Sequence, residues 1–183
     1  KTIKGFTVQN LSANPTSSAL AGGAWASGGN LNTLRFSFDV YQSGTQTAAM
    51  ATGGYDPPTG SQAVNETYNG TAWTEVGDLN TGRGDLVGVG TATSALANGG
   101  WTGSVSGLNE SWNGTSWTEV ADLNTARRGL EGFGADNTSA LAFGGYTSTF
   151  TAATELWNGS GWTEVSDLNV AKANGASFGT VAG

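Results

Sequence analysis

Residues 112–128 read WNGTSWTEVADLNTARR, and this stretch decides the fold because it occurs several times along the chain. The motif WTEVxDLN begins at Trp73, Trp117 and Trp162, so consecutive copies lie 44 and 45 residues apart. A degenerate copy, WASGGNLNTLR, begins at Trp25. In every copy a basic residue follows the tryptophan by ten positions, at Arg35, Arg83, Arg127 and Lys172. Self-similarity of this kind indicates a repeat architecture.

Each repeat also has a glycine pair, an aromatic residue and a glutamate upstream of its tryptophan. The glycine pairs with their aromatics are Gly53-Gly54-Tyr55, Gly99-Gly100-Trp101 and Gly144-Gly145-Tyr146. The glutamates in register are Glu66, Glu110 and Glu155. An Asn-Gly pair precedes each tryptophan by a few positions, and this dipeptide is a strong signal for a tight hairpin turn.

Turn signals divide each repeat into four short segments. In the third repeat these segments are RRGLEGFGA, SALAFGGY, ATELW and WTEV. Four antiparallel strands in about 45 residues are typical of one blade of a β-propeller. The composition agrees, because 30 glycines in 183 residues and only 11% charged residues favour a turn-rich, all-β protein over a helical one.

This order of features resembles the kelch repeat family. Arg127, Gly144-Gly145, Trp157 and Trp162 match that family's pattern, as do the equivalent residues of the two preceding copies. The resemblance implies an all-β, kelch-like β-propeller of four-stranded antiparallel blades. It also implies a structural role for the repeated positions, which are Gly53, Gly54, Trp73, Arg83, Gly99, Gly100, Trp117, Arg127, Gly144, Gly145 and Trp162.

We predict three full blades, over residues 35–79, 80–123 and 124–168. Residues 1–34 then form an N-terminal segment with the degenerate last-strand unit at Trp25, and residues 169–183 form the first strand of a further or composite blade. The two ends are complementary, so one interpretation is a four-bladed ring closed by both termini. The alternatives are a longer array, consistent with a chain that opens without an initiator methionine, and a ring completed by several chains.

The composition excludes several classes of function. The net charge of −7, with only seven Lys and Arg residues, argues against nucleic acid as a partner. No apolar run approaches the roughly 20 residues of a membrane span, so we expect no membrane partner. The chain has no cysteine and no histidine, which removes thiol and imidazole nucleophiles and metal ligands. We therefore expect no cofactor and no metal, and we set aside the copper-radical oxidases that contain kelch-like blades.

The glutamates raise the question of glycoside hydrolysis. That reaction needs two carboxylates in different environments, whereas equivalent residues of successive blades have similar surroundings. We expect Glu66, Glu110 and Glu155 to pair instead with the repeat arginines, and Asp78, Asp122 and Asp167 to cap turns rather than bind calcium. The sequence thus predicts no catalytic residues and no enzyme, with a glycosidase as the weak alternative.

Loops that differ between repeats are the predicted contact surface. The stretches that follow the glycine pairs, starting at residues 55, 101 and 146, diverge while their flanks do not. Variable loops on a constant scaffold are how repeat proteins build binding surfaces. The candidate ligand or partner contacts are Tyr55, Asp56, Trp101, Tyr146 and Phe150. The alternative for the aromatic residues is packing between blades.

The repeat sequence WNGTxWTEVxDLNTARRGLxGFG also resembles the repeats of Gly/Thr-rich kelch-like proteins of marine bacteriophages. That resemblance implies a non-enzymatic structural or host-recognition component of a phage particle, such as a fibre, an appendage, or a capsid- or tail-associated protein. Its location would be the virion or the extracellular space. Its partners would be other virion proteins or copies of itself, together with a host surface glycan. The alternative is a carbohydrate-binding module or cell-surface adhesin that uses the loop aromatics.

Overall fold

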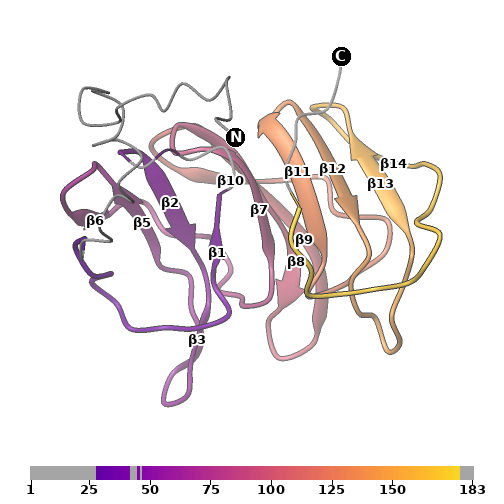
Figure 1. Ribbon diagram of the computed structural model, residues 1–183, viewed down its shortest axis with the longest axis horizontal. Coiled ribbons are helices and arrows are strands. Elements are labelled where there is room, and N and C mark those ends of the chain that lie inside the picture. Colours follow the sequence, from indigo (N-terminus) through magenta and orange to yellow (C-terminus); the bar gives the residue numbers. More distant parts are fainter. Residues whose placement is uncertain (1–27, 42–44, 46, 178–183) are drawn as a thin grey trace, which may run out of the picture.

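The structure is a computed structural model that describes residues 28–41, 45 and 47–177. These residues form strands and turns, with no helix in the described ranges (Figure 1).

Three sheets of four strands each make up three blades. Blade 1 contains β1 (Asp39–Val40), β2 (Ala49–Thr52), β5 (Asn65–Tyr68) and β6 (Trp73–Glu75). Blade 2 contains β7 (Val87–Thr91), β8 (Ser94–Trp101), β9 (Val105–Trp112) and β10 (Trp117–Val120). Blade 3 contains β11 (Glu131–Asp136), β12 (Ser139–Phe143), β13 (Thr154–Trp157) and β14 (Trp162–Glu164).

Every blade is an antiparallel meander in which neighbouring strands follow one another along the chain, apart from a hairpin inserted in blade 1. That hairpin consists of β3 (Tyr55–Asp56) and β4 (Gly60–Ser61), which form a two-stranded sheet of their own, and Tyr55 also bridges to Phe36. The blades fall within residues 35–79, 80–123 and 124–168. The predicted fold class, an all-β propeller of four-stranded blades, is confirmed.

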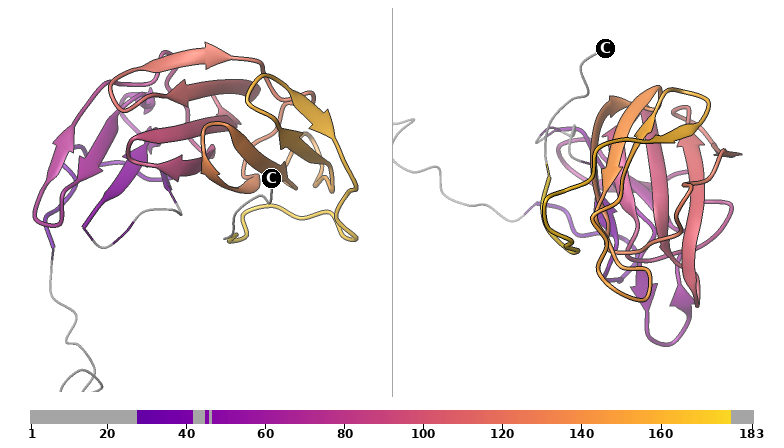
Figure 2. Two further views of the ribbon diagram at one scale, coloured as in Figure 1. Left: turned by 90° about the horizontal axis from the view of Figure 1, so that it is seen from above. Right: turned by 90° about the vertical axis from the view of Figure 1, so that its right-hand side faces the viewer.

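The blades stand side by side along an arc (Figure 2, left). Their first strands lie on the inner side of this arc, and β7 contacts both β1 and β11. The predicted N-terminal unit at Trp25 and residues 178–183 lie outside the described residues. Residues 169–177 contain no strand. They nevertheless run beside β11, where Ser177 Oγ donates a hydrogen bond to the carbonyl of Gly132 at 2.8 Å.

A ladder of backbone hydrogen bonds links the blades along the inner side of the arc. The amide of Asp85 donates to the carbonyl of Ser37 (2.9 Å), Gly129 donates to Asp85 (2.8 Å), and Asn174 donates to Gly129 (2.8 Å). All four residues are left-handed, with φ between 51° and 57°. Each stands two positions after a repeat basic residue, so the same backbone turn recurs once per unit.

The hydrophobic core lies between successive blades. Tyr41 and Met50 of blade 1 pack with Trp112 and Trp117 of blade 2. The next interface has the same design, and its buried residues include Val89, Leu96, Ala140, Ala142, Trp157 and Trp162. Fully burying such side chains stabilises a fold by about 1.5–3 kcal/mol each. The recurring Trp117 and Trp162 therefore hold one blade against the next.

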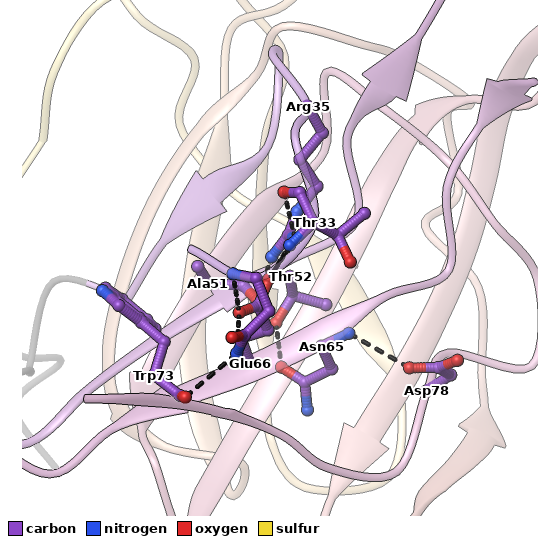
Figure 3. A network of polar contacts seen from close by, with 9 residues as sticks. Thr33, Arg35, Ala51, Thr52, Asn65, Glu66, Trp73 and Asp78 are labelled. Atoms are coloured by element: carbon purple, nitrogen blue, oxygen red, sulfur yellow. Dashed lines mark hydrogen bonds and ion pairs between the residues drawn. The ribbon is translucent and has the colours of Figure 1, made fainter. Parts of the chain in front are cut away.

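A buried carboxylate fixes each joint between units. In blade 1, Glu66 accepts hydrogen bonds from the amide and side chain of Asn32 (2.7 and 2.9 Å) and forms an ion pair with Arg35 (Figure 3). Burial raises the pKa of Glu66, but the hydrogen bonds from Asn32, Arg35 and Thr33 outweigh it, so the net pKa is lowered. The ionised form of this carboxylate is therefore the one that the joint stabilises.

The same arrangement recurs in the other two blades. Asn80 and Arg83 hold Glu110, and Asn124 and Arg127 hold Glu155. The predicted pairing of the repeat glutamates with the repeat arginines is therefore present. The aspartates differ from the prediction, because Asp78, Asp122 and Asp167 do not cap their own turns. Their side chains accept hydrogen bonds from backbone amides of the third strands, which are Asn65 and Thr154 at the start of β5 and β13 and Asn109 within β9.

Candidate functional site

The candidate site begins with a contact that each blade repeats. The residue after the repeat basic residue pairs, through two backbone hydrogen bonds, with the aromatic residue after the glycine pair. The lengths of these bonds are 2.7–3.1 Å. The three pairs are Phe36 with Tyr55, Gly84 with Trp101, and Arg128 with Tyr146. The repeat thus brings all three predicted loop aromatics to one edge of the arc.

The glycine pairs make this approach of the chain possible. In blade 2, the amide of Gly100 donates to the carbonyl of Arg127 in the next joint, at 2.9 Å. A Cβ atom on Gly99 would lie 2.6 Å from that same carbonyl oxygen, and Gly99 has a φ of +62°. Only glycine meets both conditions without strain. Trp101 follows directly, so its place at this edge is set by the backbone.

The side chains at this edge vary although the backbone does not. The first position after the repeat basic residue is Phe36, Gly84 or Arg128, and the second is Ser37, Asp85 or Gly129. Constant backbone with variable side chains is the arrangement expected where a repeat protein encodes specificity.

Arg128 is the centre of the edge. Its guanidinium carbon lies 5.0 Å from the centre of the Trp101 ring and 5.4 Å from the centre of the Tyr146 ring. Its Nη1 donates a hydrogen bond to Asp85 Oδ2 at 2.9 Å. The side chains of Arg128 and Asp85 are 38% and 28% exposed. Cation–π contacts and an ion pair therefore hold a charged group in place while a ligand can still reach it.

Aromatic pairs flank Arg128 and Asp85 on two sides. Phe36 and Tyr55 meet edge to face with ring centres 5.4 Å apart, and Tyr146 and Phe150 do so at 5.8 Å. Phe36 is 52% exposed and Phe150 is 61% exposed. Large apolar side chains gathered at the surface mark interaction sites more often than scattered ones do.

Two hollows open along this edge. The Tyr146 hollow, of about 280 Å³, is lined by Asp85, Arg128, Gly129, Tyr146, Phe150 and Asn174. The Trp101 hollow, of about 190 Å³, is lined by Phe36, Ser37, Tyr55, Gly84, Asp85, Trp101 and Arg128. Both hollows share Asp85 and Arg128. We call the two hollows together the aromatic edge.

The structure brings together four of the five predicted contacts, Tyr55, Trp101, Tyr146 and Phe150, in these hollows. The fifth, Asp56, lines neither. Its carboxylate accepts a hydrogen bond from Thr59 Oγ1 at 3.0 Å inside the turn of the β3–β4 hairpin. Sequence reasoning missed Phe36, Asp85 and Arg128. The sequence contained a signal for them, because the first and second positions after the repeat basic residue differ from one repeat to the next.

The carboxylates considered for hydrolysis lie elsewhere. Glu66, Glu110 and Glu155 are 0–1% exposed, each enclosed by its joint. Trp117 and Trp162 are buried and Trp73 is half-buried, away from the hollows. In the ranges that the structure describes, no three Asp, Glu, His or Cys side chains gather as a metal site, and no helix is long and apolar enough to span a membrane. The edge offers aromatic faces, one ion pair and amide groups.

Comparison with known proteins supports the fold. No protein-family model and no curated protein matches the chain. The solved structure of YjhT is similar, with a TM-score of 0.61 and 14% sequence identity. The similarity covers 72% of this chain, which spans 56% of the length of YjhT. At that identity the likeness concerns the fold alone, and it agrees with a propeller-like arrangement of blades.

Proposed function

We propose that this chain is a non-enzymatic recognition module that binds glycans at the aromatic edge. The observation that carries the proposal is the convergence of variable side chains, at constant backbone positions, on Arg128 and Asp85 between exposed aromatic rings. Aromatic rings stack on the apolar faces of sugars, and a few fixed polar groups orient the hydroxyl groups. The enclosure of Glu66, Glu110 and Glu155 supports binding rather than hydrolysis.

The setting that we propose is a phage particle, where glycan recognition would select the host. Its support is the sequence resemblance to Gly/Thr-rich kelch-like proteins of marine bacteriophages. Mass spectrometry of purified particles tests this setting. Detection of the chain as a stoichiometric particle component is expected, and its loss during purification would count against a virion role while leaving glycan binding open.

A glycan array tests the binding function directly. The wild-type chain is expected to bind a defined set of glycans, and Tyr146→Ala and Trp101→Ala are expected to weaken that binding at least tenfold. The control is Tyr68→Ala, which removes a half-buried aromatic side chain that lines neither hollow. Equal binding by Tyr146→Ala, Trp101→Ala and wild type, or no binding by a folded wild-type chain, would contradict the proposal.

A further inference from the structure

The two hollows are neighbours that share an ion pair in their walls. Asp85 and Arg128 line both of them. Each hollow also contains one of the two rings that contact the Arg128 guanidinium, Trp101 in one and Tyr146 in the other. A ligand that occupies both hollows therefore passes over Arg128 and Asp85.

The size of the hollows limits what each one holds. Sites for drug-sized ligands measure about 300–1,000 Å³. The hollows measure about 280 and 190 Å³, so each lies below this range while the two together fall within it. One ring-sized group fits each hollow, and a ligand of two linked rings fits the pair.

The walls favour flat, partly apolar rings. Phe36 stands edge to face on Tyr55, at an interplanar angle of 61°, and Phe150 stands on Tyr146 at 75°. Aromatic side chains have only two side-chain torsions, so they present contact area at a low cost in conformational entropy. A pyranose ring has an apolar face of C–H groups that matches such a surface.

The electrostatics favour an uncharged ligand. Asp85 balances the charge of Arg128 at 2.9 Å, so the pair presents no net charge to the hollows. A carboxylate on the ligand would have to compete with Asp85 for the guanidinium, close to a like charge and on a chain with a net charge of −7. Hydroxyl groups have no such conflict, because they both donate to Asp85 and accept from Arg128.

We propose that the aromatic edge binds a neutral oligosaccharide through two adjacent sugar rings, one in the Trp101 hollow and one in the Tyr146 hollow. The glycosidic linkage passes over Arg128 and Asp85. This assignment rests on the proposed glycan-binding function and makes it specific. It states the number of sugar rings recognised, their lack of charge and the residues that contact each ring.

The test uses nuclear magnetic resonance titration of the ¹⁵N-labelled chain, whose mass of 18.5 kDa suits the method. The probes are lactose, cellobiose, maltose and chitobiose, their component monosaccharides, and 3′-sialyllactose as the anionic counterpart of lactose. The smallest neutral glycan that binds on the array is added to the set. At least one disaccharide is expected to bind ten times more tightly than either component monosaccharide, and to shift the Trp101 indole and the Tyr146 amide together.

Variants in the two hollows separate the two sugar positions. The pair Phe36→Ala/Tyr55→Ala and the pair Tyr146→Ala/Phe150→Ala are each expected to reduce disaccharide affinity to the level of the monosaccharide. Circular dichroism checks that each variant is folded, and Trp101→Phe provides a conservative change that keeps a ring in place. Tyr68→Ala is the control for loss of an aromatic side chain outside the hollows.

The outcomes distinguish this inference from the function on which it rests. A monosaccharide that binds as tightly as its disaccharide, shifts confined to one hollow, or tighter binding of 3′-sialyllactose than of lactose would overturn the two-ring, neutral assignment. Glycan binding at the edge would stand in each of those cases. No binding to any array glycan would overturn both.

Discussion

Arg83 and Glu110 form an ion pair from which solvent is excluded, with Arg83 Nη1 2.5 Å from Glu110 Oε1 and both side chains 0–1% exposed. Arg83 Nη2 also donates to the carbonyl of Ala97 at 3.0 Å, and Glu110 accepts from the amide of Asn80 at 2.7 Å. The pair therefore ties the joint before blade 2 to the second and third strands of that blade. Removing one partner would leave a buried charge without compensation.

We expect Arg83→Met and Glu110→Gln each to lower the free energy of unfolding by about 3–5 kcal/mol. The double variant is expected to lose less than the sum, because the two groups interact. Urea denaturation of the four proteins completes the double-mutant cycle. Arg128→Met is the control, since its part-exposed pair with Asp85 contributes about 0–1 kcal/mol and each of its two cation–π contacts about 0.5–1 kcal/mol, so a smaller loss than that of Arg83→Met is expected. Additive losses in the cycle would show that the pair does not act as a unit.

Replacing Gly99 tests whether the position two residues before Trp101 requires glycine. Its φ is +62°, and an added Cβ would meet the carbonyl of Arg127 at 2.6 Å. Left-handed backbone alone costs an L-residue about 1–2 kcal/mol, so Gly99→Ala is expected to destabilise by at least that amount. Gly161→Ala is the control, because a Cβ there meets nothing within 4 Å. Thermal unfolding of both variants decides, and equal melting temperatures would refute the explanation.

The two tryptophans of one hairpin are expected to respond differently to loss of the indole N–H. Trp112 Nε1 donates to the carbonyl of Ala92 at 3.0 Å, whereas the buried Trp117 Nε1 has no partner among the described residues. Both changes to Phe reduce packing, but only Trp112→Phe also removes a hydrogen bond. We expect it to cost about 1 kcal/mol more than Trp117→Phe. Urea midpoints of the two variants measure this difference, and a larger loss for Trp117→Phe would contradict it.

We expect the folding stability of the protein to depend on pH through Asp39. Burial raises the pKa of Asp39 from 3.8 to about 6, although its hydrogen bond from the Gly88 amide acts in the opposite direction. The folded state therefore binds the Asp39 proton more tightly than the unfolded state. This group's contribution to stability is greatest below pH 3.8, falls as the pH rises to about 6, and is constant above that.

Replacing Asp39 with Asn removes the titration and keeps an acceptor for Gly88. The variant is expected to gain stability relative to wild type as the pH rises from about 4 to about 6. The full shift corresponds to at most about 3 kcal/mol, and partial exposure of Asp39 reduces this. Urea denaturation at pH 4, 5, 6 and 7 measures the difference between the proteins. A difference that does not change with pH would contradict the assignment.

The fold was predictable because its signals recur at fixed spacing. The tryptophans, glycine pairs and glutamates mark a strand, a close approach of backbone and a buried ion pair, and each appears three times. The aromatic edge was only partly predictable. Tyr55, Trp101 and Tyr146 follow the glycine pairs and are visible in the sequence. Arg128 and Asp85 are 43 residues apart and meet because blades 2 and 3 are neighbours, which no local pattern in either segment indicates.

The ladder of left-handed residues along the inner side of the arc has a consequence for protein engineering. Its amide-to-carbonyl bonds do not depend on the side chains, so residues 36 and 128 can be randomised without altering the backbone that presents them, whereas a Cβ on Gly84 would lie 3.3 Å from the backbone of Gly54. Residues 37 and 85 tolerate a smaller set of residue types, because their φ is positive, and any side chain at position 129 would in addition require the Asn174 side chain to move. A library that follows these two rules would display a different recognition surface on each member while preserving one scaffold.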